Sequence, residues 1–251
     1  MTNESSASTL PDGVLPDQAA VGAIIVAAGA STRMGDDDKT LADLAGTPLI
    51  ARTVGVFERC DAVGTAVLMI AQKNLGTIAE ISRDHRWKKV AHVRLGGERR
   101  QDTVRIGLRS LPPCEWVVVH DGARPLVTES EIRDGLRAAS ATGAAIAAVV
   151  PVDTVKRVTD DGRIAETLDR RTLALAQTPQ VFRRDLLERA HNEVREDATD
   201  DAAMLERIGV EVRVYRGAAT NIKITTPEDL LLAEALIAAA AAGKDADGAP
   251  A

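Results

Sequence analysis

Short apolar runs alternate along this chain with amphipathic stretches long enough to form helices. Continuous apolar runs of this kind are typical of parallel strands that are buried on both faces. Strands that alternate with helices predict an α/β fold, with an open, mostly parallel sheet, right-handed crossovers and flanking helices. The runs lie at residues 23–27, 66–70, 90–95, 116–120 and 144–150.

Two helix starts are indicated by their local chemistry. Thr47 and Pro48 offer an N-cap hydroxyl followed by a proline at the first helical position. Thr128 and Glu131 have the spacing of a capping box. Later in the chain, the pattern predicts helices over 183–196, 200–208 and 227–241 and a strand over 210–215.

The alternation of strands and helices is interrupted at residues 152–171. Here Val152–Val158 and Arg163–Leu168 alternate apolar and polar residues on either side of Asp161-Gly162. An Asp-Gly turn between two such runs predicts a β-hairpin. Because the hairpin is polar on both faces, we expect an arm that protrudes from the domain and packs on a second subunit, giving a homodimer.

Both ends of the chain are polar and rich in small residues. Residues 1–20 and 243–251 are typical of disordered tails, which leaves one folded domain over 21–242 that includes the arm. A chain of 251 residues, 45% of them hydrophobic, can bury a core without disulfides or metals. A net charge of −6 argues against a nucleic-acid partner, and an aromatic content of 2% argues against a base-stacking surface.

The sequence also predicts a cytoplasmic protein that does not contact membranes. Its two cysteines, Cys60 and Cys114, form no CxxC pair, and we expect ordinary thiols in a reducing compartment. No run of 18 apolar residues is present that could span a bilayer. The first 20 residues lack the charged and apolar regions of a secretion signal.

The first candidate site follows the first apolar run. Ligands of open α/β sheets bind beyond the carboxyl ends of the strands, and small residues let backbone N–H groups approach phosphate oxygens there. The segment 26–35 is such a turn, and Arg33 and Lys39 add two cations to it. It is neither a P-loop nor a G-x-G-x-x-G turn. A triphosphate attacked at its α-phosphate suits this loop; an ordinary turn with solvated charges is the alternative.

The fourth apolar run ends in the segment His120–Pro125. Asp121, at the end of a predicted strand, can hold Mg²⁺ or a ribose hydroxyl, or can merely cap the turn. We expect His120 to be a packed core histidine. Five further polar clusters have roles that their pattern alone leaves open: Asp153–Arg157, Thr167–Arg170, Gln177–Gln180, Thr199–Asp201 and Asn221–Thr225.

Taken together, these segments resemble one family, the 2-C-methyl-D-erythritol 4-phosphate cytidylyltransferases of the non-mevalonate isoprenoid pathway. The resemblance covers roughly residues 22–240. It implies a Rossmann-like fold of the nucleotidyltransferase type. It also implies transfer of CMP from CTP to methylerythritol phosphate, with Mg²⁺ as cofactor and pyrophosphate as by-product. The most specific segments are 96–99, 120–125, 151–157, 177–182 and 221–229.

The resemblance assigns roles to single residues on the nucleotide side. Arg33 and Lys39 match the catalytic cations that hold the triphosphate, and Asp121 matches the aspartate near the ribose and the metal. Asp121 also belongs to the set that matches the cytidine-binding residues. The complete set is Ala27, Ala28, Gly29, Gly97, Glu98, Thr103, Asp121 and Ala123.

A second set of residues matches the pocket for the sugar-alcohol phosphate. In the family, Thr154 and Arg170 would lie on the arm and enter the neighbouring subunit's site, which agrees with the hairpin expected at 152–171. The complete set is Thr154, Arg170, Thr178, Thr199 and Lys223.

The chain departs from the family pattern in the nucleotide loop. Val26 and Asp38 replace prolines, and the loop resembles the molybdenum-cofactor nucleotidyltransferases equally well. The carboxylates of 36–38 would repel a triphosphate unless they face solvent or help to hold Mg²⁺. Three alternatives therefore stay open: a ribitol 5-phosphate cytidylyltransferase, a molybdenum-cofactor nucleotidyltransferase, and a non-catalytic nucleotide-binding homologue.

Overall fold

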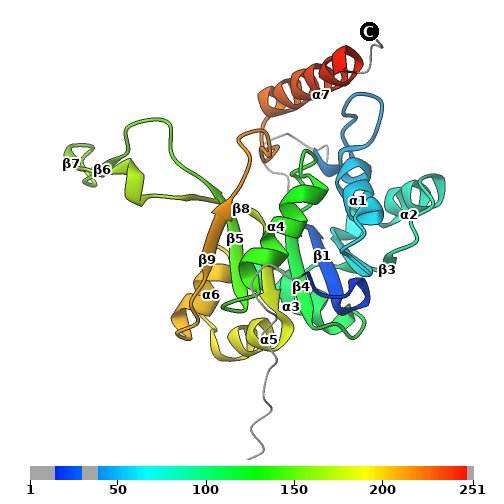
Figure 1. The fold of residues 1–251 in the computed structure, drawn as a ribbon, viewed down its shortest axis with the longest axis horizontal. Helices are drawn as coiled ribbons and strands as arrows, with labels where there is room; N and C mark the ends of the chain where they lie inside the picture. Colours follow the sequence, from blue (N-terminus) through cyan, green and yellow to red (C-terminus); the bar gives the residue numbers. More distant parts are fainter. Residues whose placement is uncertain (1–14, 30–38, 248–251) are drawn as a thin grey trace, which may run out of the picture.

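A seven-stranded sheet forms the centre of the protein (Figure 1). The computed structural model describes residues 15–29 and 39–247. The strand order is β3-β2-β1-β4-β8-β5-β9, and every neighbouring pair is parallel except those of β8. The strands are β1 Val21–Ala27, β2 Thr65–Ile70, β3 Val90–Leu95, β4 Trp116–Asp121, β5 Ala144–Val149, β8 Leu175–Arg183 and β9 Arg213–Arg216. The mostly parallel α/β sheet expected from the sequence is thus confirmed.

Strand β8 is the element that the apolar pattern did not predict. It runs antiparallel between β4 and β5, so the sheet is mixed. Its polar side chains Gln177, Thr178 and Gln180 are all buried, at 7%, 4% and 1% exposure. Polar residues that are buried through hydrogen bonds hide the apolar signature of a strand, and this explains why the segment reads as a polar cluster.

Helices cover both faces of the sheet (Figure 1). The expected helices are present, with ends that differ by a few residues. Their bounds are α1 Leu49–Arg59, α2 Leu75–Asp84, α3 Arg100–Ser110, α4 Glu129–Ala139, α5 Arg184–Glu193, α6 Asp201–Arg207 and α7 Pro227–Asp247. Short 3₁₀ segments occur at Gln18–Ala20, Lys39–Leu41, Gln72–Asn74 and Arg170–Thr172.

One of the two expected helix caps is confirmed. The Glu131 N–H donates to the Thr128 hydroxyl, and the Thr128 N–H donates to the Glu131 carboxylate, so α4 opens with a capping box. At α1 the expectation was wrong by one position, because Pro48 occupies the N-cap and no side chain caps the helix. The Thr47 carbonyl instead accepts the Leu44 N–H and closes the preceding turn.

Secondary structure is present on the outer side of both expected domain boundaries. Leu15 packs against the buried cluster, and Gln18–Ala20 form a 3₁₀ turn capped by the Asp17 carboxylate. At the other end α7 continues to Asp247, since its alanines are strong helix formers. Among the described residues, none of the helices combines the length and the apolarity needed to cross a membrane.

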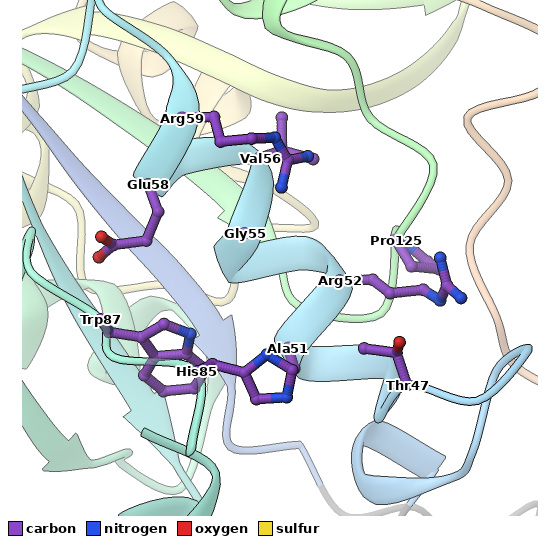
Figure 2. Close-up of a pocket in the computed structure, with 10 residues that line it drawn as sticks. All are labelled: Thr47, Ala51, Arg52, Gly55, Val56, Glu58, Arg59, His85, Trp87 and Pro125. Carbon is purple, nitrogen blue, oxygen red and sulfur yellow. The ribbon is translucent and has the colours of Figure 1, made fainter. Parts of the chain in front are cut away.

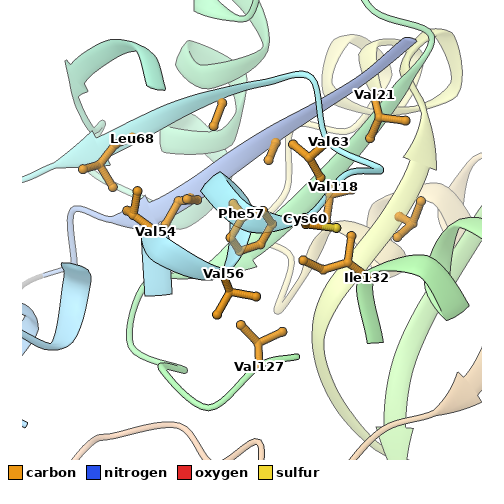
Figure 3. Close-up of a cluster of buried hydrophobic side chains, with 14 of the residues drawn as sticks. Val21, Val54, Val56, Phe57, Cys60, Val63, Leu68, Val118, Val127 and Ile132 are labelled. Carbon is orange, nitrogen blue, oxygen red and sulfur yellow. The ribbon is translucent and has the colours of Figure 1, made fainter. Parts of the chain in front are cut away.

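Two buried clusters, one on each face of the sheet, make up most of the core. The first joins α1 and α4 to the strands through residues such as Phe57, Val118 and Ile132 (Figure 3). The second lies under α3, α5 and α6, and both clusters are mostly aliphatic, as the low aromatic content requires. Cys60 is fully buried in the first cluster, and burial raises the pKa of its thiol. Both cysteines are free, as expected.

The expected hairpin is present and forms a small sheet of its own. Strands β6 Lys156–Val158 and β7 Ile164–Thr167 pair antiparallel, and every residue in them is exposed. Gly162 closes the turn at a φ of 81°, a conformation that favours glycine. Figure 1 shows the hairpin standing well clear of the domain. The paired region is shorter than predicted, because the segments on either side of it are irregular.

Candidate active site

A cleft of about 480 Å³ opens beyond the carboxyl ends of β1 and β4. The end of β1 supplies Val26–Gly29, and the end of β4 supplies Asp121. The loop between β3 and α3 supplies Gly97–Arg99, and the first residue of α3 is Arg100. Lys39 and Lys223 complete the cationic part of its lining. Small residues, backbone groups and two lysines meet here, as a phosphorylated nucleotide requires.

Every residue of the expected cytidine-binding set lines this cleft. Lys39 lies with them, whereas Arg33 and the carboxylates of 36–38 are outside the described residues. The residues brought together are Ala27, Ala28, Gly29, Gly97, Glu98, Thr103, Asp121 and Ala123.

The turn at Gly97 is held tightly against the start of α3. The Gly97 N–H donates to the Thr103 hydroxyl at 3.0 Å, and that hydroxyl donates to the Arg99 carbonyl at 3.1 Å. A Cβ at position 97 would lie 2.6 Å from the Asp102 Cβ, so a larger residue would push the loop away from the helix. Thr103 therefore shapes the backbone edge that a base would meet.

A second cleft of about 270 Å³ adjoins the first. Both are lined by Arg100, Asp121 and Lys223, so these three residues mark the place where two ligands would meet. The remaining lining comes from β8, from the start of α6 and from Arg124.

The expected polyol-phosphate residues fall into two groups. Thr178, Thr199 and Lys223 line the second cleft. Thr154 and Arg170 do not line it, because they are exposed on the arm, where an Arg170 N–H donates to the Val152 carbonyl. Within one chain the structure thus brings together three of the five residues.

Asp121 lies between two cations. Its carboxylate is 2.6 Å from Lys223 Nζ and 3.4 Å from Arg100 Nε. Burial opposes the ionisation of Asp121, but Arg100 and Lys223 outweigh it and hold the pKa of this carboxyl well below its usual range. The junction of the two clefts therefore carries a fixed negative charge flanked by two positive ones.

Arg100 is a site residue that the sequence analysis missed. Its guanidinium joins Asp121 to Asp201, which it contacts at 2.6 Å. Asp201 is fully buried and also lies 3.2 Å from His191 Nε2. Burial opposes the charge on Arg100, but Asp201 and Asp121 outweigh it and raise the pKa of the guanidinium. The available signal was the position of Arg100 immediately after the segment 96–99.

His120 is a buried structural residue, as expected. Its ring packs against Phe57 at a centroid distance of 5.3 Å, and burial lowers its pKa to about 4. A neutral ring with Nε2 donating to the Arg124 carbonyl leaves Nδ1 to accept from the Thr178 hydroxyl at 3.0 Å. The same hydroxyl accepts from the Asp121 N–H, so this chain of contacts fixes the end of β4.

Stability should depend on pH through His120. Between pH 6.5 and pH 4 the unfolded chain binds a proton that the folded protein excludes, so stability falls as the pH falls. The expected loss from pH 7 to pH 5 is about 2 kcal/mol. Urea unfolding should be measured at both pH values for the wild type and for His120→Gln, whose side chain cannot titrate. The variant should lose about 2 kcal/mol less stability than the wild type between pH 7 and pH 5. Equal losses in both proteins would contradict this reading of His120.

Asn221 anchors the segment that carries Lys223. It is fully buried, and its Nδ2 donates to the Glu131 carboxylate at 3.0 Å and to the Thr178 carbonyl at 2.9 Å. Its own carbonyl accepts from Arg124 at 2.6 Å. Asn221 therefore connects the segment that carries Lys223 to the start of α4 and to strand β8, and its role is structural.

A separate hollow of about 440 Å³ lies along α1 (Figure 2). Its lining includes Arg52, Arg59, His85 and Trp87, and it shares no residue with the two clefts described above. The carboxylate of Glu58 in this hollow accepts the N–H groups that lead into β3, so its role is structural. The candidate active site is therefore the pair of clefts that meet at Asp121.

The sequence matches the family model described as IspD, 2-C-methyl-D-erythritol 4-phosphate cytidylyltransferase, over residues 21–239. An enzyme of that name from Dehalococcoides mccartyi is 46% identical over 217 residues, which cover 86% of this chain and 96% of that protein. A further one from Pelotomaculum thermopropionicum is 43% identical over 226 residues, or 87% of this chain and 94% of that one.

Solved structures agree with the sequence comparison. The crystal structure of 4-diphosphocytidyl-2C-methyl-D-erythritol synthase from Anaerococcus prevotii matches with a TM-score of 0.77 and 28% identity, covering 86% of this chain and 95% of that one. The crystal structure of 2-C-methyl-D-erythritol 4-phosphate cytidylyltransferase from Thermus thermophilus matches with a TM-score of 0.69 and 28% identity. The match covers 85% of this chain and 97% of that one.

Proposed function

This chain belongs to the 2-C-methyl-D-erythritol 4-phosphate cytidylyltransferase family, and on that premise we propose that it transfers CMP from CTP to 2-C-methyl-D-erythritol 4-phosphate. The products are 4-diphosphocytidyl-2-C-methyl-D-erythritol and pyrophosphate, in isoprenoid precursor biosynthesis. The observation that carries the proposal is the meeting of two clefts at Arg100, Asp121 and Lys223. One cleft contains the residues matched to cytidine, and the other contains three of those matched to the polyol phosphate.

The reaction needs positioning and charge stabilisation more than proton transfer. An oxygen of the substrate phosphate attacks the α-phosphorus of CTP, the new P–O bond forms, and the bond to the β-phosphate breaks as pyrophosphate leaves. A phosphate monoester is already an anion near neutral pH, so the attack requires no strong base. His120, neutral and hydrogen-bonded on both nitrogens, is not needed for it. Lys39 and Arg33 hold the triphosphate and stabilise the charge that builds at the α-phosphorus.

Asp121 is the residue that suits a magnesium ion. Its carboxylate is ionised and lines both clefts, and Mg²⁺ prefers carboxylate and phosphate oxygens. No group of three or more metal-binding side chains gathers within the described ranges, and Asp121 is the residue that would hold the ion. The ion would neutralise charge on the triphosphate and on the departing pyrophosphate.

Turnover should depend on added magnesium. Incubation with CTP, methylerythritol 4-phosphate and Mg²⁺ should release one pyrophosphate for each diphosphocytidyl product, as measured by phosphorus NMR. EDTA should abolish the reaction and excess Mg²⁺ should restore it, because the charge on the leaving group would otherwise be unscreened. Undiminished turnover in EDTA would remove the metal from the proposal.

The arm supports a homodimer with shared sites. Apolar side chains on it and at its base are unusually exposed for aliphatic residues: Val152 at 84%, Ile164 at 64% and Val158 at 60%. A hairpin that exposes this much apolar surface gains stability by packing on another body. A partner's arm would also bring Thr154 and Arg170 to the second cleft. We further propose a cytoplasmic protein whose partners are CTP and the polyol phosphate, with no nucleic acid.

A further inference from the structure

Arg100 contacts two carboxylates at the junction of the two clefts. Its Nη1 donates to Asp201 at 2.6 Å and its Nε to Asp121 at 3.4 Å. Asp201 stands in the first turn of α6, is fully buried, and contacts His191 of α5. Arg100 therefore cannot turn away without depriving the buried Asp201 carboxylate of its guanidinium partner, which is strongly unfavourable.

Lys223 is held differently. Its ammonium contacts Asp121 at 2.6 Å, its side chain is 42% exposed, and it lines both clefts. A lysine ammonium is a compact charge on a flexible stem, so it can exchange one anionic partner for another. Asp121 thus has one fixed cation and one exposed cation.

We propose that Arg100 is a positioning residue that stays paired with Asp121 as its permanent counter-ion. Because Arg100 remains, Lys223 can break its ion pair with Asp121 and bind the phosphate group of the incoming sugar-alcohol phosphate. The inference rests on the function proposed above. When Lys223 turns to the substrate, the buried Asp121 keeps Arg100 as its partner. Without Arg100, the same movement would leave Asp121 with neither of the two side-chain cations that the structure pairs with it, so only the magnesium ion proposed above would balance its charge, and this would weaken binding.

Two neighbours of Asp121, Arg124 and His120, do not replace Arg100. Arg124 directs its guanidinium to the Asn221 carbonyl at 2.6 Å, and burial lowers the pKa of Arg124. His120 is committed to the Arg124 carbonyl and the Thr178 hydroxyl. The Arg100–Asp201 pair is therefore the contact that keeps a cation beside Asp121.

The test is calorimetric binding of methylerythritol 4-phosphate in the presence of a saturating α,β-methylene analogue of CTP. Arg100→Met should raise Kd on the order of 10-fold, a coupling of ordinary size for residues in one charged network. Arg105→Met is the matched control, since Arg105 lies on the same helix and pairs with Asp102 at 2.7 Å. The control should shift Kd less than about 2-fold, and Arg100→Lys should recover most of the lost affinity.

A double-mutant cycle separates this role from a direct contact with substrate. In the Asp121→Asn background Lys223 has no carboxylate to leave, so Arg100→Met should then change Kd by less than about 2-fold. An equal loss in both backgrounds would mean that Arg100 binds the ligand itself and would overturn the inference. If Arg100→Met does not fold, Asp201→Asn, which loosens the guanidinium, should show a smaller loss that likewise disappears with Asp121→Asn.

The outcome also separates this inference from the proposed function. A wild-type protein that neither binds nor converts methylerythritol 4-phosphate would overturn both. A wild-type protein that does both, while Arg100→Met behaves like Arg105→Met, would overturn the inference alone.

Discussion

Replacing Lys39 by alanine is expected to lower kcat by about 10²–10⁴-fold, as for other cations that stabilise charge in phosphoryl transfer. Lys39 lines the nucleotide cleft together with the β1 turn and Asp121. On the proposed mechanism, loss of its ammonium would remove a positive charge from the place where negative charge builds at the α-phosphorus. We expect Arg33→Ala to act similarly on the evidence of the sequence, since position 33 lies outside the described residues.

Steady-state pyrophosphate release checks this prediction, with Lys88→Ala as a control. Lys88 is an exposed lysine outside both clefts, and its replacement should leave kcat unchanged. Thermal unfolding of the Lys39 variant should match that of the wild type, because this side chain is not part of the three buried clusters. A Lys39→Ala protein that keeps more than a third of wild-type kcat would exclude Lys39 from the mechanism.

Mixing two inactive variants should restore activity. In the proposed dimer, Lys39→Ala would damage a site through the body of its own chain, whereas Arg170→Ala would damage the partner's site through the arm. Each mixed dimer would contain one doubly damaged site and one intact site. Random pairing makes about half of the dimers mixed, so about a quarter of wild-type activity should return after co-refolding.

The separate variants, refolded alone, serve as the controls and should stay near background. A mixture no more active than the sum of its parts would mean that Arg170 acts in its own subunit or has no role. Light scattering gives an earlier check, because a monomer at the assay concentration would contradict the shared site outright.

The parallel core of the fold was predictable because its strands are apolar throughout. The runs at 23–27 and 116–120 are buried on both faces and match β1 and β4 closely. Strand β8 escaped prediction because Gln177, Thr178 and Gln180 make its buried positions polar. Periodicity detects burial through apolar side chains, and it fails where hydrogen bonds make burial of polar ones possible.

The site was predictable where backbone and small residues form it, and less so where buried charges support it. The residues that the resemblance matches to cytidine, from Ala27 to Ala123, line one cleft. The pairing of Arg100 with Asp201 joins residues about a hundred positions apart. Charged residues of this kind resemble solvated surface groups in a sequence, and only the structure shows that Asp201 is fully buried where α6 packs against α5 and that Arg100 is partly buried against it.

The identity of the polyol phosphate is the central claim, and one comparison tests it most directly. Pyrophosphate release from CTP and Mg²⁺ should be measured with methylerythritol 4-phosphate and with ribitol 5-phosphate, and kcat/KM compared. The account predicts efficient turnover of methylerythritol 4-phosphate and a kcat/KM for ribitol 5-phosphate lower by at least about 10-fold, since a site that pairs with one set of hydroxyls leaves polar groups unpaired with another. A higher kcat/KM for ribitol 5-phosphate would contradict it.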